Sequence, residues 1–339
     1  MSNVNLLDLA KMTAPDGSIA PDIVQMMMQV NDVLRLMPFM TGNQTMGHQS
    51  VSNVGLPKGT YRRIYGKVKP TKGHQVQLVD TCAELAARSV IDKTIIDLAG
   101  KDNSEGRKVR MNEDRNHIEG MSQQIAEGII YGNEAELPEG MTGLAPRFSS
   151  TSNPNGRNIF TAGTGGTKNR SIWLIVAGDR TVSGITPKGS SAGIEHLDMG
   201  MQSIHDGTDE VSGGAMLAYE SWYYARFGLM VKDWRYVCRI CNVDLATADA
   251  VWSDGAFSGG IDLTDLMFKA DGWLHSRGAG RAFWLMDRAT KILLQQQTSA
   301  KTSGSILGYE DVGGKKMMTA LDMPIGVTDA LETNETSIT

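Results

Sequence analysis

Residues 171–189 read SIWLIVAGDRTVSGITPKG, and this stretch predicts the strands around which the rest of the chain is arranged. The first part, residues 171–177, is almost continuously apolar and rich in Ile and Val, which is typical of a strand buried on both faces. Residues 181–185 predict a second strand directly after it. The sequence therefore predicts a sheet near the middle of the chain, with further segments on either side.

Toward the N-terminus, the most regular pattern is a helix predicted over residues 107–131. Its apolar side chains recur at helical spacing, at Met111, Ile118, Met121, Ile125 and Ile129. At 1.5 Å per residue such a helix is about 35 Å long, enough to brace a whole domain. Shorter helices are predicted over residues 81–98, before Gly100, and over residues 21–37, before Pro38.

Toward the C-terminus, strands and helices alternate only loosely. The strand-like runs 219–229 and 234–240 are separated by Lys232 and Asp233, which predicts an antiparallel hairpin. The polar residues 190–214 before them predict a surface loop or an excursion, such as an insertion. Helices are predicted over 263–274 and 287–297, strands over 281–286 and 323–327, and a hairpin over 304–319. With no internal repeat, this pattern indicates an α+β protein.

Composition excludes several classes of protein. Of the 339 residues, 41% are hydrophobic and 21% charged, values that indicate a globular chain rather than a disordered one. The three cysteines are too few for a disulfide scaffold. No signal peptide is expected at the start, and the apolar run 172–177 is far too short to span a bilayer.

Charge is unevenly distributed along the chain. The formal net charge is −5, but residues 33–79 contain no Asp or Glu and carry +7. Residues 1–32 carry −3 and residues 80–339 carry −9. The basic stretch also shows partial alternation, with turn chemistry at residues 55–59, and predicts an extended hairpin. Its candidate contact residues are Lys58, Arg62, Arg63, Lys67, Lys69 and Lys72.

Three interpretations of the basic hairpin compete. It is an ordinary solvated face, or it binds nucleic-acid phosphate, or it lies on the acidic body of another copy of the chain. A long hairpin with few large apolar residues cannot form its own core. The hairpin must therefore lie on something else. The net acidic charge excludes a uniformly basic, histone-like coat for nucleic acid.

Two short motifs do not support the chemistry that they suggest. The loop at 163–168 is rich in Gly and ends in Lys168, but its spacing differs from that of a phosphate-binding P-loop, and a connector is favoured. Cys238 and Cys241 have CxxC spacing. On a predicted strand, however, residues three apart point to opposite faces, so buried structural cysteines are favoured over zinc or redox chemistry.

Two groups of titratable residues are also better explained without catalysis. Ligand-type side chains follow one another in a segment predicted as a solvated loop, where a weak metal site stays open: His196, Asp198, His205, Asp206, Asp209 and Glu210. Glu113, Asp114 and His117 are predicted on the wet face of the long helix. We therefore expect no catalytic residue, no cofactor and no metal, and a structural or interaction protein instead of an enzyme.

The stretch 171–189 resembles a segment of the major capsid proteins of short-tailed, double-stranded DNA bacteriophages. The similarity continues through Tyr219-Glu220-Ser221-Trp222, Phe227-Gly228-Leu229 and Asp233-Trp234-Arg235, and through residues 143–148 and 323–331. It covers about residues 140–331. That family has the capsid fold shared by tailed phages and herpesviruses, and it has no catalytic residues to transfer to this chain.

The resemblance implies a division of the chain into five parts. Residues 1–40 are the expected N-terminal arm, and residues 41–80 are the expected extended hairpin loop. Residues 81–244 are the expected peripheral domain, with a spine helix at 107–131 and a long sheet. Residues 245–330 are the expected axial domain, and residues 331–339 are a C-terminal tail.

The function implied is that of a subunit that assembles into the icosahedral shell around a DNA genome. Its partners would be other copies of itself, in hexamers and pentamers. A decoration or cement protein, a scaffolding protein, the portal and packaged DNA on the inner face are further candidates, and no membrane is involved. The expected location is the virion, after assembly in the bacterial cytoplasm. The alternatives are a nucleic-acid-binding module that uses the basic hairpin, a metal- or nucleotide-dependent enzyme, and the shell of a bacterial compartment.

Overall fold

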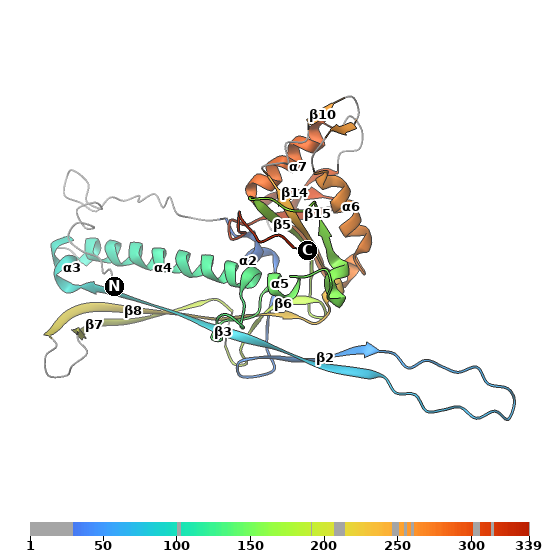
Figure 1. The fold of residues 1–339 in the computed structure, drawn as a ribbon. Helices are drawn as coiled ribbons and strands as arrows, with labels where there is room; N and C mark the ends of the chain where they lie inside the picture. Colours follow the sequence, from blue (N-terminus) through green and yellow to red (C-terminus); the bar gives the residue numbers. More distant parts are fainter. Residues whose placement is uncertain are drawn as a thin grey trace. The chain divides into compact units, whose positions relative to one another are not determined.

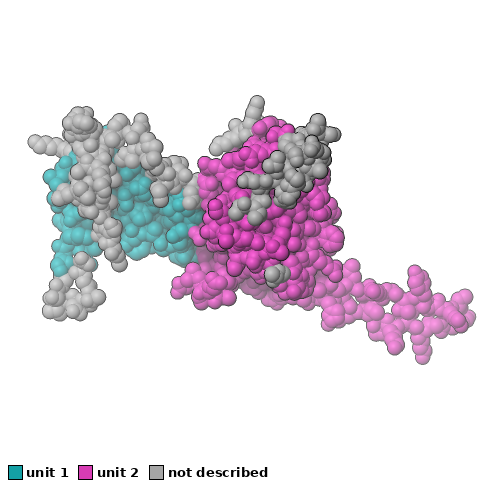
Figure 2. Space-filling view, turned by 45° about the horizontal axis from the view of Figure 1, so that its top comes forward, with its two compact units in different colours: residues 1–29, 84–125, 192–226 teal, residues 30–83, 126–191, 227–339 magenta. Residues whose placement is uncertain are grey.

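The computed structural model describes residues 30–99, 103–190, 192–206, 214–245, 251–253, 256–258, 261–300, 306–312 and 315–338. The chain divides into two compact units, coloured separately in Figure 2. The first contains residues 1–29, 84–125 and 192–226, and the second contains residues 30–83, 126–191 and 227–339. Most of the predicted arm and of the helix predicted at 21–37 lies outside the described residues. What is described there is α2 (Asp32–Leu36), which ends before Pro38.

The first unit is built on helix α4 (Asn103–Tyr131), most of which belongs to it. The helix predicted over 107–131 is confirmed and begins four residues earlier. Strands β7 (Ile194–Asp206) and β8 (Gly214–Val231) pair in antiparallel fashion, with His196 opposite Tyr223. Two elements next to each other in the chain, β3 (His74–Asp92) and α3 (Lys93–Ala99), also contribute to this unit.

The helix predicted over residues 81–98 is wrong for most of its length, because β3 continues to Asp92 before α3 begins. Burial from residue 84 onward alternates with a period of two, so that Leu85 and Ser89 are covered while Glu84 and Arg88 are exposed. The Ala- and Leu-rich composition favours a helix locally. Pairing with distant strands overrides that weak preference.

Two predictions between residues 190 and 240 are also wrong. Residues 194–206 of the polar segment are not a loop, since they form strand β7. The runs 219–229 and 234–240 do not pair with each other. Instead, β8 pairs with β7 and β6 (Val182–Thr186), whereas β9 (Val237–Asp244) pairs with β4 (Ile159–Thr161) and β5 (Asn169–Ala177). The turn η2 (Trp234–Tyr236) separates the two strands.

The core of the second unit surrounds β5, the strand predicted at 171–177. It lies between β9 and β12 (Arg281–Met286), and β12 is followed by β15 (Met323–Val327), β14 (Lys315–Ala320) and β13 (Leu307–Val312). Helices α6 (Leu263–Trp273) and α7 (Arg288–Ala300) lie alongside these strands (Figure 1). Residues from the strands and both helices share one apolar core, which includes Leu174, Met267, Trp284 and Leu294.

Capping residues explain where the two helices start. Asp262 accepts hydrogen bonds from the amides of Thr264 and Asp265 at the start of α6. Asp287 does the same for Ala289 and Thr290 at the start of α7. Such caps satisfy amides that have no partner within the helix. The helices, strands and hairpin predicted between residues 263 and 327 are confirmed.

Smaller elements complete the second unit. Strand β1 (Phe39–Thr41) pairs in parallel with β6, and helix α5 (Leu144–Arg147) follows the end of α4 along the chain. The remaining elements are η1 (Pro154–Asn158), η3 (Arg277–Ala279), β10 (Val251–Ser253) and β11 (Ala256–Ser258). No helix within the described ranges is long and apolar enough to cross a membrane.

The basic segment forms the predicted hairpin and extends away from the rest of the second unit. Strand β2 (Gly47–Gly55) pairs with residues 74–81 of β3, and residues 56–73 connect the two strands without regular structure. The ribbon and its connection form a narrow extension in Figures 1 and 2.

Candidate assembly site

The six cations predicted as contact residues all lie on the connection between β2 and β3. Lys58, Arg62, Arg63, Lys67, Lys69 and Lys72 are exposed. Among the described residues, none of them forms an ion pair with a carboxylate of its own chain. Arg62 donates to the carbonyl of Gly66, which closes a local turn. The hairpin therefore presents its positive charge to the outside of the subunit.

The same connection also exposes large apolar side chains, which are not part of the predicted set of contact residues. The exposed fractions are 82% for Leu56, 86% for Ile64 and 98% for Tyr65, and Tyr61 is fully exposed. Along the ribbon, Val51 and Val54 of β2 and Val76 and Val79 of β3 are also exposed. Exposed apolar side chains gathered on one element mark a contact surface. Their spacing within the basic segment was visible in the sequence.

Arg147 holds the root of the hairpin, where the ribbon meets the second unit. Its guanidinium donates to the carboxylate of Asp80 on β3, with an Nη2–Oδ1 distance of 2.8 Å. It also donates to the carbonyls of Thr142, Gly143 and Leu229. One side chain thus joins β3, α5, the loop before α5 and the end of β8. The sequence analysis missed this residue.

In the first unit, an aromatic stack joins α4 to the hairpin of β7 and β8. The ring of Tyr223 lies between the imidazoles of His117 and His196, with centroid distances of 5.2 and 5.0 Å. The Tyr223 hydroxyl donates to Asp114, and Glu113 lies beside His117. Burial, followed by the hydrogen bond to Asp114, raises the pKa of Tyr223. The helix residues predicted to face water therefore contribute to packing instead.

The remaining residues of the predicted ligand-type segment do not form a metal site in the described part of the chain. Asp198 is paired with Arg110 of α4 at 2.6 Å, and that hydrogen bond lowers its pKa. His205 is exposed on β7. Asp209 and Glu210 lie outside the described residues, as does the side chain of Asp206. No group of three metal-ligating side chains occurs among the residues described.

The CxxC pair Cys238 and Cys241 and the loop at 163–168 lie in surroundings that fit a structural role. Cys238 and Cys241 lie on β9, are buried and are not joined in a disulfide. Burial raises the pKa of Cys238 to about 12, so its thiol is protonated at neutral pH. The loop at 163–168 runs between strands β4 and β5 and not into a helix, so it lacks the helix N-terminus of a phosphate site. A strand does precede it, which the sequence did not indicate.

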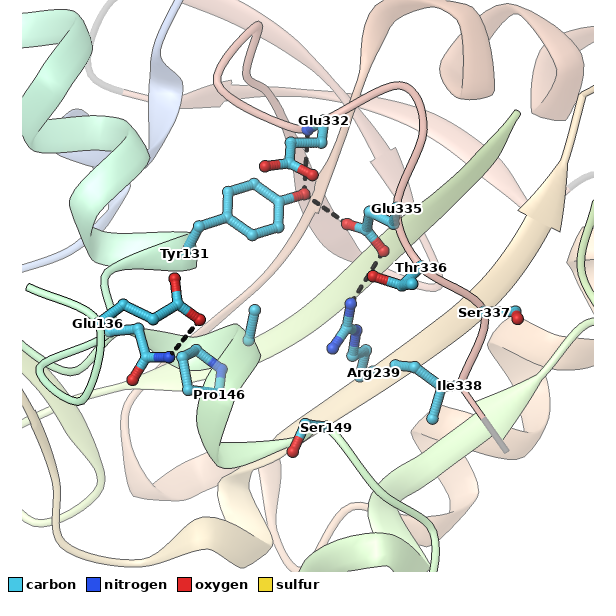
Figure 3. A pocket seen from close by; sticks show the side chains of 12 residues that line it. Tyr131, Glu136, Pro146, Ser149, Arg239, Glu332, Glu335, Thr336, Ser337 and Ile338 are labelled. Carbon is cyan, nitrogen blue, oxygen red and sulfur yellow. Dashed lines mark hydrogen bonds and ion pairs between the residues drawn. The ribbon is translucent and has the colours of Figure 1, made fainter. Parts of the chain in front are cut away.

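The C-terminal segment, predicted as an acidic tail, is pinned into the second unit by Glu335. This carboxylate accepts hydrogen bonds from Tyr131 and Ser171 and pairs with Arg239 at 2.9 Å, as Figure 3 shows for Tyr131 and Arg239. Both charged side chains are 5% exposed. Burial and the neighbouring Glu335 raise the pKa of Tyr131. Asn242 and Ile338 exchange two further hydrogen bonds.

An open cavity of about 490 Å³ lies beside this segment. Its wall is largely polar and is formed by the end of α4, the loop after it, α5 and residues 332–338. Figure 3 shows that the Arg239 guanidinium at this wall is directed to Glu335 and not into open space. Arg239 is the only cationic side chain among the described residues of the wall. Because it is already neutralised, these residues offer no free positive charge with which to bind an anion.

Comparison with known proteins identifies the family. The model of the family described as major capsid protein GP7 matches residues 14–339. No curated protein matches the chain.

Among solved structures, a chain of the cryo-EM structure of bacteriophage Epsilon15 matches with a TM-score of 0.74 at 24% identity. The match covers 99% of this chain and 97% of that one. A bacteriophage JBD30 capsid chain, 10% identical, gives a TM-score of 0.45 and covers 100% of this chain and 95% of its own length. A Mycobacterium phage Adephagia chain, 9% identical, gives 0.44 and covers 68% and 92%. The fold assignment rests on the Epsilon15 match. With the family match over nearly all its length, the chain belongs to the major capsid protein GP7 family.

Proposed function

We propose that the basic hairpin of each subunit lies on the acidic body of a neighbouring copy and holds the shell together there. Membership of the capsid family makes the chain a structural subunit of the virion and favours this location over the shell of a bacterial compartment. The observation that carries the proposal is that one hairpin exposes six cations together with large apolar side chains on both of its strands and on the connection between them. Within its own described chain, this set has no covering element.

Physical chemistry supports an external partner for the hairpin. A two-stranded ribbon is marginally stable in water, because it has no third layer on which to bury side chains. The ribbon carries +7 together with the residues just before it, and residues 80–339 carry −9. Each exposed ion pair contributes only about 0–1 kcal/mol. Repetition around a closed, symmetric shell makes the contacts multivalent, so that small individual energies suffice.

The finer architecture follows the same proposal. Copies of the chain form hexamers and pentamers and close an icosahedral shell around double-stranded DNA. Residues 1–40 act as an arm, 41–80 as the extended loop, 81–244 as the peripheral domain, 245–330 as the axial domain and 331–339 as a tail. The candidate further partners are a decoration or cement protein, a scaffolding protein, the portal and packaged DNA. No catalytic role is assigned to any residue.

Charge reversal on the hairpin tests the proposal. A variant with Arg62→Glu, Arg63→Glu, Lys67→Glu and Lys69→Glu should fold but fail to form closed shells, because like charges then meet at the contact. Negative-stain electron microscopy after expression reads the outcome. The matched control reverses four exposed cations of the second unit outside the hairpin, Arg157, Lys168, Arg180 and Lys188, and should assemble. Hairpin-reversed shells of normal yield and heat resistance would refute the contact.

A further inference from the structure

The root of the hairpin differs from the rest of the ribbon because its polar side chains are buried. His48 of β2 and Asp80 of β3 are directly opposite each other in the antiparallel pair and are 8% and 4% exposed. Only a few residues further out, Val51 and Gln77 form an exposed pair. The ribbon therefore leaves the second unit at this point, and the contacts made here set its direction.

Arg147 is the group that fixes this point. Its guanidinium contacts Asp80 at 2.8 Å and reaches the carbonyl of Leu229 at 3.4 Å, so it ties β3 to the end of β8. Its bonds to Thr142 and Gly143 hold it on the loop before α5. Arginine is suited to this role because its planar fork presents several donors in fixed directions. No other described basic side chain forms an ion pair with Asp80.

The contacts of Arg147 at the root leave several nearby polar atoms without partners. Among the described residues, Oδ2 of Asp80 and Nδ1 of His48 are buried without a hydrogen bond, and so is Oγ of Ser50. His48 and Ser50, two residues apart on β2, point to the same face of the ribbon. Buried polar atoms without partners are costly, so the packed root is less stable than a fully satisfied one.

We propose that Arg147 is a positioning residue for assembly, which fixes the direction in which the hairpin leaves the subunit. Protonation of His48 in acid weakens the packing of this root. The inference rests on the proposed function, since a fixed direction matters only if the hairpin must meet a neighbour.

The direction of the acid effect follows from what surrounds His48. Asp80 faces it from β3, Lys232 lies after the end of β8, and Arg147 approaches Asp80 from α5. Cys82, also near Asp80, has a pKa of about 11 because it is buried, and so does not titrate in this range. Glu134 contacts the neighbouring Thr81 hydroxyl. Burial and then Lys232 lower the pKa of His48, against the opposing effect of Asp80.

The packed root therefore favours the neutral imidazole. Above the ordinary pKa of histidine, about 6.5, His48 is neutral both in the packed root, where it is buried, and in an opened root, where its imidazole is solvated. The packed root then keeps its full advantage in free energy. As the pH falls through that value, the opened root, with a solvated imidazole, binds the proton first. The equilibrium then shifts toward the opened root.

Distance measurements between two nitroxide labels on the full-length subunit test this directly. One label is placed at Gln75→Cys on the exposed ribbon and the other at Arg180→Cys on the second unit. The native cysteines, all buried, need no replacement. A control pair at Glu139→Cys and Arg180→Cys lies wholly outside the hairpin and reports whether a variant is folded. Spectra are recorded at about pH 7.5 and about pH 5.

With the native root we expect one narrow hairpin distance at the higher pH and a second, displaced population at the lower pH. Arg147→Gln should show the displaced population at both, as about half of the molecules or more. Arg147→Lys should give a displaced population of intermediate size, since Lys keeps the positive charge but not the planar guanidinium. His48→Gln should remain narrow at both.

A single narrow distance in Arg147→Gln with an unchanged control pair would overturn the positioning role. An acid response that persists in His48→Gln would overturn the role of the imidazole. If Arg147→Gln changes the distance distribution of the control pair, the Arg147→Lys variant is used as the test of the positioning role. A native distance distribution of the hairpin pair in Arg147→Lys would then contradict the proposal. Because the readout concerns a single subunit, these results do not depend on whether hairpin-reversed shells assemble.

Discussion

At the scale of single residues, Glu335 illustrates how a late and unremarkable acidic residue becomes part of the core. Its carboxylate compensates the charge of Arg239, whose guanidinium also lies over the ring of Trp173 at 4.8 Å and donates to the carbonyl of Phe148. The pair is almost completely excluded from water. A buried charge in such a place is tolerated only while its partner is present.

Replacing this carboxylate therefore has a predictable cost. Glu335→Gln should lower the free energy of unfolding by about 3 kcal/mol, because Arg239 would stay buried without a counter-charge. Urea unfolding followed by tryptophan fluorescence measures the change. Glu139→Gln, at an exposed position, serves as the control and should stay within about 0.5 kcal/mol of the native value. A similar small effect for Glu335→Gln would mean that the pair does not stabilise the fold.

At the scale of elements, α4 contacts the β7–β8 hairpin through specific aromatic and charged side chains. Met111 and Ile118, two of the residues whose spacing predicts the helix, are exposed, whereas His117 packs on Tyr223. Arg110 adds an ion pair with Asp198 and lies over the ring of Tyr219 at 4.9 Å. The contact between the helix and the β7–β8 hairpin is thus aromatic and charged.

Tyr223 is the centre of this contact, and two substitutions separate its roles. Tyr223→Ala should lower the unfolding free energy by about 3–5 kcal/mol, because it removes a fully buried ring. Tyr223→Phe keeps the stack and loses only the bond to Asp114, for about 1–2 kcal/mol. Thermal and urea unfolding measure both. Tyr309→Ala, at a residue 75% exposed, should have little effect. Equal losses in Tyr223→Phe and Tyr223→Ala would assign the stability to the hydroxyl rather than to the stack.

What the sequence could predict at this scale depended on how local the information was. The helix at 107–131 and the strands at 281–286 and 323–327 have clear local patterns and capping or turn residues. β3 and β7 do not, because an Ala-rich or Gly-rich polar segment becomes a strand only when a distant partner pairs with it. The exposed cations of the hairpin were predictable from composition. Arg147 and Glu335 were not, since their partners lie 67 and 96 residues away.

At the scale of the whole molecule, the division of charge is the property that bears on assembly. Under the proposed function, the basic hairpin of one copy attracts the acidic remainder of another, whereas a uniform charge of −5 would only repel. Attraction between exposed charges also guides the encounter of subunits before close contacts form.

The rate of assembly should therefore depend on salt. Between about 0.05 and 0.5 M salt, the screening length falls from roughly 13 to 4 Å, and the initial rate seen by light scattering should fall about tenfold. A variant with Arg62, Arg63, Lys67 and Lys69 all changed to Gln should assemble slowly with little dependence on salt. A rate that is unchanged or rises with salt in the native chain would show that apolar contacts control the encounter.

The burial of Glu335 also has a consequence for how the subunit is made. Arg239 leaves the ribosome 96 residues before its partner, and at about 5–20 residues per second this interval lasts about 5–20 s. Throughout that time β9 carries an uncompensated guanidinium, and the strand cannot reach its final packing. A nascent chain therefore cannot complete the packing of β9 around Arg239 until Glu335 has been synthesised.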